Sequence, residues 1–302
     1  MNRGLLATIG AFLIWGLLPV YLHQLHGVPP TQVMSQRLVW CCIFTLAWLA
    51  LRGELRHVAI ALRTPAVRWR LSATALLVST NWLLYVWAVA NGRIVESSLG
   101  YFINPLVNVL LGVAVLSERL NRTQWTAVAL ASTGVAYLTW LGGGLPWIAL
   151  VLAVTFGSYG LIRKTVAVDA LSGLGAETLL ITPIGLAYLL WCEHAGTGVL
   201  GHGGRWIDFL LIASGIVTAI PLALFAFGAR LIPYSTVGLI QYIGPSLQLL
   251  TGVLIYHEPF PFNRAIGFIL IWAALVVYAI DGLMRARSTV ATTAPAAAAP
   301  AD

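Results

Sequence analysis

The chain has 302 residues, of which 59% are hydrophobic and only 9% are charged, and its formal net charge is +7. Soluble domains carry roughly 25% charged residues, so this composition excludes a soluble cytoplasmic enzyme, a nucleic-acid-binding domain and a disordered chain. We therefore expect an all-α integral membrane protein. The excess of Lys and Arg over Asp and Glu is first examined as a signal of membrane topology.

Ten apolar runs are long enough to cross a bilayer as helices, which takes about 20 residues each. They predict ten transmembrane helices, over residues 4–22, 32–51, 71–90, 97–117, 123–141, 145–163, 172–192, 206–227, 235–256 and 264–284. Residues 286–302 are rich in Ala, Pro and Thr and predict a disordered tail.

The positions of Lys and Arg predict the orientation. If the N-terminus is cytoplasmic, 13 of the 17 Lys and Arg residues fall in cytoplasmic segments, three fall in external loops, and Arg37 lies within a span. Positive residues are enriched in the cytoplasmic loops of membrane proteins. We therefore expect a multi-pass protein of the bacterial inner membrane, in contact with lipid, with both termini cytoplasmic. Nucleic acid is not an expected partner, because topology accounts for the positive charge.

An internal repeat relates the two halves at an offset of 140 residues. Within 97–118 and 237–258, seven of 22 positions are identical, among them the pairs Pro105 and Pro245, and Glu118 and Glu258. The offset divides the chain into two repeats of five helices, 3–141 and 145–285. Because five is odd, the second repeat enters the membrane from the opposite side, as in many secondary transporters. A duplicated scaffold without transport is the alternative.

Polar side chains near the middle of the spans are the candidate substrate-binding residues, because polar groups inside a membrane are costly. Tyr101, Asn104 and Asn108 share one helix face, and Gln241, Pro245 and Gln248 share the matching face of the second repeat. The remaining candidates are Trp15, Asn81, Tyr85 and Tyr159. This uncharged polar and aromatic set suits a neutral, zwitterionic or aromatic small molecule. The alternative is that Asn and Gln only join neighbouring helices.

Prolines and two charges complete the candidate site. Pro19, Pro105 and Pro245 kink their helices and are the candidate gating residues, with a static bend as the alternative. Arg37 and Glu177 are charged positions within the spans. Arg37 is expected either to extend outward to the membrane surface or to bind an anionic group in an outer vestibule. Glu177 is the candidate for proton coupling, with a capped or inward-extending structural residue near the start of its helix as the alternative. The expected depths of the two residues differ by about 12 Å, which argues against a direct ion pair.

The sequence lacks the usual motifs for nucleotide binding, metal-dependent hydrolysis and cysteine metal sites. The chain has neither GxxxxGK[ST] nor HExxH, and its three cysteines form no Cys-x-x-Cys pair. We therefore expect no enzymatic activity, no cofactor and no metal site.

Three stretches carry a family resemblance: FLIWGLLPVY (12–21), SQRLVW (35–40) and NWLLYVWAVANGRIVESSLGYFINPLVNVLLGVAVLSERL (81–120). They resemble the RarD-type permeases of the EamA family, in the drug/metabolite transporter superfamily. The resemblance implies ten helices in two inverted repeats, with transport around a central cavity. Family members are named for chloramphenicol sensitivity or resistance, and other branches resemble exporters of amino acids and metabolites.

Together these observations predict a secondary transporter, an exporter of small organic molecules such as metabolites, amino acids or chloramphenicol-like drugs, working by alternating access. Protons are the candidate coupling ion. The alternative function is a non-transporting membrane scaffold or accessory subunit.

Overall fold

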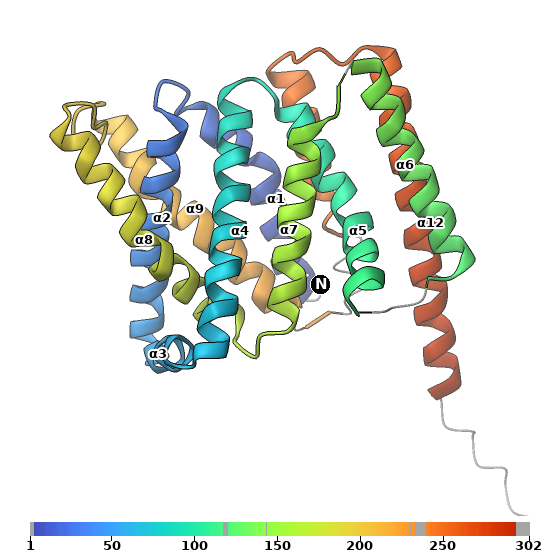
Figure 1. Cartoon of the computed structure of the whole chain (residues 1–302), viewed down its shortest axis with the longest axis horizontal. Coiled ribbons are helices and arrows are strands. Elements are labelled where there is room, and N and C mark those ends of the chain that lie inside the picture. The colour runs from blue at the N-terminus through green and yellow to red at the C-terminus, as the bar shows by residue number, and fades with distance from the viewer. Residues whose placement is uncertain (1–2, 117–119, 143, 230, 233–239, 294–302) are drawn as a thin grey trace, which may run out of the picture.

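The computed structural model describes residues 3–116, 120–142, 144–229, 231–232 and 240–293, and these residues form a helical bundle (Figure 1). The helices of the first half are α1 (Arg3–His23), α2 (Pro30–Leu51), α3 (Leu55–Arg63), α4 (Pro65–Ala90), α5 (Ile94–Leu116) and α6 (Arg122–Gly142). Those of the second half are α7 (Trp147–Lys164), α8 (Ala170–His194), α9 (Arg205–Ala229), α11 (Ile243–Leu250), the π-helical turn η1 (Thr251–Ile255) and α12 (Phe262–Thr293).

Local sequence signals set the helix ends. Pro30 and Pro65 open α2 and α4, where a proline has no hydrogen bond to lose. The Asp169 side chain caps α8 by accepting hydrogen bonds from the N–H groups of Leu171 and Ser172. Gly92, at φ +62°, follows the end of α4 in the left-handed conformation that commonly stops a helix.

The all-helical prediction is confirmed for the described residues, and each of the ten predicted spans overlaps a described helix. Seven of the described helices are long and apolar enough to cross a membrane, and the apolar segments Trp147–Arg163 and Ile243–Ile255 are shorter. Residues 235–239 of the ninth predicted span lie outside the described part. The number of ten crossings and the inverted repeat therefore stay predictions.

Two segments differ from the sequence expectation. Residues 55–63, between the second and third predicted spans, form the short helix α3, which has apolar residues on one face and arginines on the other. Helix α12 continues to Thr293, so residues 286–293, expected to be disordered, are helical. Residues 294–302 of the expected tail lie outside the described part.

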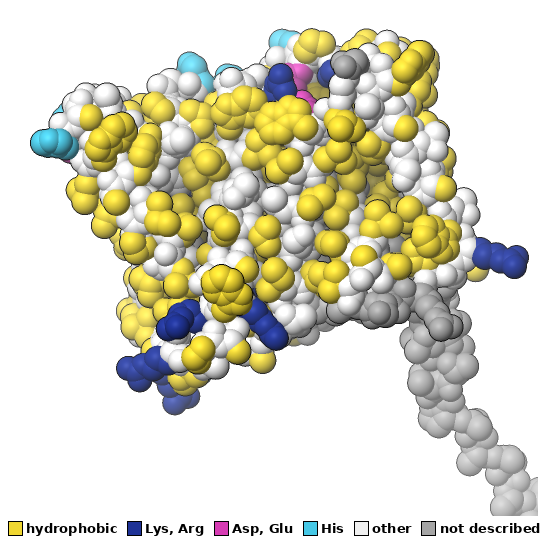
Figure 2. Space-filling view, in the orientation of Figure 1, with side chains coloured by type: hydrophobic (Ala, Val, Ile, Leu, Met, Phe, Trp, Pro, Cys, Tyr) yellow, Lys and Arg dark blue, Asp and Glu magenta, His cyan; other side chains and the backbone are white. Residues whose placement is uncertain are grey.

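The helices lie side by side in a fixed order across the bundle. Helices α2 and α8 pack together at one edge and α6 and α12 at the other, with α4, α7, α1 and α5 between them (Figure 1). Apolar side chains cover the flank of the bundle, and Lys and Arg gather at the end that carries α3 (Figure 2). An apolar flank with charge at the ends is the surface expected of a protein in a bilayer.

Glycines allow the closest helix crossings. A Cβ atom on Gly215 of α9 would collide with the carbonyl carbon of Trp40 and would lie 2.6 Å from the main-chain nitrogen of Cys41, both on α2. Small residues at such crossings let helix backbones approach within a membrane. The α2–α9 crossing matters because it brings Arg37 of α2 against Thr218 of α9.

Candidate functional site

Arg37 lies at the α2–α9 crossing with only 3% of its surface exposed. Its Nε atom donates a hydrogen bond to the Thr218 hydroxyl, 2.6 Å away, and its guanidinium carbon lies 4.8 Å from the ring centroid of Trp82 on α4. Its Nη1 atom is buried and has no hydrogen-bond partner among the described residues. The site therefore contains a buried cation with an unused donor.

Tyrosines from three helices lie within electrostatic range of this guanidinium: Tyr21, Tyr85 and Tyr101. The rings of Tyr85 and Tyr101 meet edge to face at 5.7 Å between centroids. The Tyr101 hydroxyl donates to Oδ1 of Asn81 at 3.3 Å, and the Tyr21 hydroxyl donates to the carbonyl of Leu210. The Tyr85 hydroxyl is buried and has no described partner. We call Arg37, Trp82, Tyr85, Tyr101 and Thr218 the arginine cluster.

The asparagines of the predicted site join helices. The Asn81 amide donates to the carbonyl of Leu152 and to the hydroxyl of Thr155, both at 2.9 Å and both on α7. The Asn104 amide donates to the carbonyl of Ala153 at 3.1 Å. These bonds fasten α4 and α5 to α7, so both asparagines contribute amide donors to helix packing.

Asn108 lies further along α5, with an exposed side chain. Its amide donates to Oδ1 of Asn104 at 3.1 Å. The polar face predicted for Tyr101, Asn104 and Asn108 is therefore present on α5. Its two ends differ, because Tyr101 meets the arginine cluster and Asn108 lies at the surface.

Glu177 forms a second buried charged group, and only 1% of its surface is exposed. Its Oε1 accepts a hydrogen bond from the Thr74 hydroxyl at 2.7 Å and lies 3.6 Å from Nε of Arg163. Its Oε2 accepts from the Tyr159 hydroxyl at 3.4 Å. We call Glu177, Arg163, Thr74 and Tyr159 the glutamate cluster.

Helix α4 contributes to both clusters, through Thr74 to the glutamate cluster and through Trp82 to the arginine cluster. These residues are eight positions apart, which is about 12 Å along a helix axis. Arg37 and Glu177 have different partners, as the depth argument from the sequence anticipated. The structure thus presents two separate charged clusters along one helix.

The remaining predicted residues lie around α1 and α11. The Gln248 amide donates to the Trp15 carbonyl at 3.2 Å, whereas its Oε1 is buried without a described partner. The Trp15 ring packs against Phe12 and Phe225. No described contact joins Trp15 or Gln248 to the arginine cluster. Gln241 is half-buried in the turn before α11.

The three prolines lie within helices: Pro19 in α1, Pro105 in α5 and Pro245 in α11. All three are buried. Their positions are compatible with hinges, and their gating role stays a prediction.

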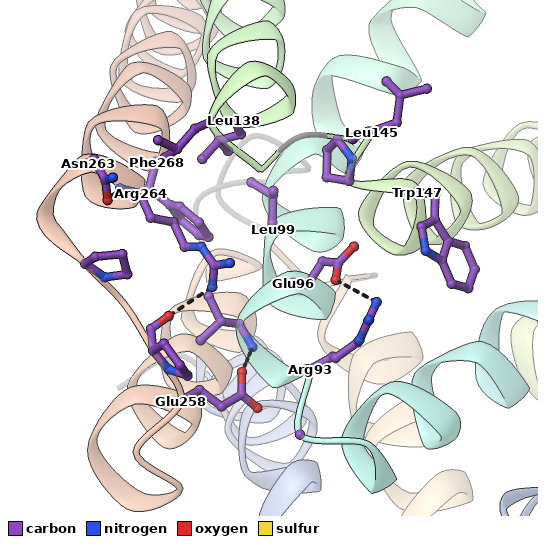
Figure 3. Close-up of a pocket in the computed structure, with 17 residues that line it drawn as sticks. Arg93, Glu96, Leu99, Leu138, Leu145, Trp147, Glu258, Asn263, Arg264 and Phe268 are labelled. Carbon is purple, nitrogen blue, oxygen red and sulfur yellow. Dashed lines mark hydrogen bonds and ion pairs between the residues drawn. The ribbon is translucent and has the colours of Figure 1, made fainter.

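A pocket of about 580 Å³ opens at the end of the bundle where α5 begins (Figure 3). Arg93 and Glu96 form an ion pair at 3.5 Å on one side of it. On the other side Glu258 accepts hydrogen bonds from the N–H groups of Ile94 and Val95. Burial raises the pKa of the Glu258 carboxyl, and these two N–H groups act in the opposite direction.

Helix α5 separates this pocket from the arginine cluster. Leu99 lines the pocket and Tyr101 belongs to the cluster, and residues two apart project from nearly opposite sides of a helix. We therefore treat the clusters in the bundle interior, rather than the pocket, as the candidate functional site.

Sequence reasoning missed four side chains of the two clusters. Arg163 was counted as a topology charge, and Trp82, Thr74 and Thr218 carried no signal of their own. The pattern offered one indirect signal for Thr74, which falls on the same face of α4 as Asn81 and Tyr85 at helical spacing. No spacing rule links Arg37 to Thr218, which is 181 residues away.

Comparison with known proteins places the chain in a family. Residues 2–140 match the EamA-like transporter family. The chain is 42% identical to an uncharacterized transporter of Vibrio cholerae over 93% of both proteins. It is 41% identical to Protein RarD of Salmonella typhimurium over 95% of this chain and 97% of that protein. A crystal structure with 19% identity matches 91% of this chain and 97% of its own, at a TM-score of 0.60, and shares the fold.

An all-helical bundle with apolar flanks, together with these relatives, defines a multi-pass membrane transporter of the drug/metabolite class. The chain belongs to the EamA-like transporter family and, within it, to the RarD-type permeases.

Proposed function

We propose that this permease is a secondary transporter that exports small organic molecules by alternating access. The observation that carries the proposal is the presence of two buried charged clusters, around Arg37 and around Glu177, inside apolar helices. Ionisable groups at such positions are costly to keep and mark substrate or ion pathways. The arginine cluster is the proposed substrate site, and the glutamate cluster is the proposed proton-coupling site.

The packing of the helices supports the proposed inverted repeat. Helix α5 packs against α7 and its repeat mate α11 packs against α1, and likewise α4 packs against α7 and α9 packs against α1. The pairs α2 and α8, and α6 and α12, also pack against each other. When each helix is replaced by its counterpart in the other half, 3–141 or 145–285, this set of contacts is preserved. Such a symmetric arrangement is the one that two gates around one site require.

The distribution of charge supports cytoplasmic termini. Five arginines lie between the end of α2 and the start of the apolar part of α4: Arg52, Arg56, Arg63, Arg68 and Arg70. This segment includes α3, which lies at the end of the bundle where α1 begins (Figure 1). Because positive residues favour the cytoplasmic side, we place this end in the cytoplasm. In a cysteine-free background, His26→Cys should react with a membrane-impermeant maleimide added to intact cells, and Arg56→Cys should not.

The rival function is a scaffold, which the use of Asn81 and Asn104 in helix packing favours. The test is flux in proteoliposomes that contain the purified protein, with amino acids, amino-acid amides and chloramphenicol as probes, in the presence and absence of a pH gradient. We expect protein-dependent flux of at least one probe, and its dependence on the gradient should disappear in Glu177→Gln. Absence of protein-dependent flux for every probe would favour the scaffold.

A further inference from the structure

We propose that Arg37 binds the anionic group of the transported molecule, so that the substrates are organic acids or zwitterions that carry a carboxylate. This inference deepens the proposed transport function and rests on it. It is narrower than the expectation from the sequence, which admitted neutral molecules as well. The argument starts from the hydrogen-bonding capacity of the arginine side chain.

A guanidinium has five N–H donors and cannot be deprotonated under ordinary conditions. In this structure its Nε–H is used by Thr218, whose own hydroxyl donates to the carbonyl of Ser214 at 2.8 Å. Nη1 is buried and has no described acceptor. Buried polar groups normally have partners, and a buried charged donor without one points to an acceptor supplied by another molecule.

The charge of Arg37 is also uncompensated among the described residues. Glu177 pairs with Arg163, Glu96 with Arg93, Glu54 with Arg52 and Glu193 with His202, and Arg37 belongs to none of these pairs. Nη1 of Arg163 is also buried without a described hydrogen-bond partner, but that arginine has the Glu177 carboxylate beside it, whereas Arg37 has none. A buried cation without an acidic partner is the natural complement of an anionic substrate.

The surroundings of Arg37 favour a carboxylate. The guanidinium lies over the Trp82 ring, and the planar fork of N–H groups on an arginine matches both oxygens of a carboxylate. The Tyr85 hydroxyl, also buried and without a described partner, provides a second donor. The rings of Tyr85, Tyr101 and Phe156 form a contiguous edge-to-face series that can contact an apolar or aromatic substrate body.

The first arm of the test changes the charge of the probe and leaves the protein unaltered. Proteoliposomes with the wild-type protein are loaded with phenylalanine or leucine, or with phenylalaninamide or leucinamide, and chloramphenicol serves as an uncharged probe. We expect protein-dependent efflux of at least one carboxylate to exceed that of its amide by about tenfold or more, the factor that a charge-assisted hydrogen bond provides. Equal or faster efflux of the amides or of chloramphenicol would overturn the inference and leave transport intact.

The second arm changes the arginine. Arg37→Gln should reduce carboxylate efflux by about tenfold or more, and Arg37→Lys, which keeps the charge but not the planar fork, should retain an intermediate rate. Arg56→Gln, at the exposed end of the bundle, is the matched control for loss of one positive charge and should transport normally. Unchanged carboxylate efflux in Arg37→Gln would overturn the inference.

Thermal unfolding of each variant in detergent separates a folding defect from a binding defect. If Arg37→Gln does not fold, the comparison of acids with amides on the wild-type protein still decides the matter. Absence of protein-dependent flux for all probes overturns the proposed function, and the inference falls with it. Flux without preference for the carboxylate overturns the inference alone.

Discussion

Glu258 accepts a hydrogen bond from the main-chain N–H of Ile94 at 2.6 Å, across 164 residues of sequence. Its other oxygen accepts from the N–H of Val95 at 2.8 Å. The first N–H groups of a helix have no partner within the helix, so the carboxylate supplies the cap that α5 lacks in its own sequence. One side chain after η1 thus fixes the start of the helix that carries Tyr101.

The first prediction concerns this cap. Glu258→Ala should lower the free energy of unfolding by about 2 kcal/mol, because it leaves two partly buried N–H groups without acceptors. Glu258→Gln, which keeps one acceptor oxygen, should have a smaller effect. The control is Glu54→Ala, which removes the exposed pair with Arg52 and should cost less than about 1 kcal/mol. Equal losses in both alanine variants, measured by thermal unfolding in detergent, would contradict the capping role.

The second prediction concerns the α2–α9 crossing. Gly215→Ala should destabilise the protein by about 1–3 kcal/mol, because the added methyl group meets the main chain of α2 rather than a flexible side chain. It should also slow transport, because it displaces Thr218 from Arg37. Gly160→Ala is the control, since a Cβ there has no neighbour within 4 Å. A Gly215→Ala protein as stable and as active as the control would show that the helices separate at little cost.

The third prediction concerns the buried ion pair. Glu177→Gln should destabilise the protein by about 3–5 kcal/mol, because Arg163 then stays partly buried without its carboxylate. Replacing both residues by Gln should recover part of the loss, since no uncompensated charge is left. A double variant less stable than Glu177→Gln by the full effect of Arg163→Gln would indicate that the two side chains do not interact.

The fourth prediction separates stability from transport at Tyr85. Its hydroxyl has no described partner, so Tyr85→Phe should leave thermal stability unchanged. The same variant should reduce efflux of carboxylate probes, because it removes the second proposed donor beside Arg37. Tyr21→Phe is the contrast, because the Tyr21 hydroxyl donates to the Leu210 carbonyl and its loss should destabilise the protein. Full activity in Tyr85→Phe would exclude the hydroxyl from substrate binding.

The fifth prediction concerns pH. The hydrogen bond to Glu193, 2.8 Å long, and the charge of that carboxylate raise the pKa of His202. The contact is therefore stabilising below the unfolded-state pKa of histidine, about 6.5, and its contribution disappears as pH rises through the higher folded-state value. Both groups are exposed, so the effect should be small. The difference in unfolding temperature between wild type and His202→Gln should shrink between about pH 6 and pH 8.

Much of the fold could be predicted from the sequence, because hydropathy alone sets where a chain forms apolar helices. The helix that was missed, α3, is short and amphipathic, and its arginines were read only as topology charges. Prediction of spans from apolar runs also treats all spans as equally apolar, although they differ. The segment 123–141 contains several Thr and Ser residues, and its helix α6, although 21 residues long, is not among the seven helices that are both long and apolar enough to cross.

The site was less accessible to sequence reasoning. Depth along the helices correctly kept Arg37 apart from Glu177, because helix rise is nearly constant. Depth does not show in which direction a side chain points around its helix axis, and it does not show which helix that side chain contacts. Consequently the use of Asn81 and Asn104 in helix packing, and the pairing of Glu177 with Arg163, became visible only when the helices were packed in three dimensions.

The position of α4 between the two clusters has a thermodynamic consequence. If substrate at Arg37 and a proton at Glu177 each favour one placement of this helix, the two binding events share one coupling free energy. The factor by which protonation of Glu177 changes the affinity for substrate must then equal the factor by which substrate changes the affinity of Glu177 for its proton. A single rigid helix, which contributes Thr74 to one cluster and Trp82 to the other, would thus convert a pH gradient into a difference in substrate affinity across the membrane.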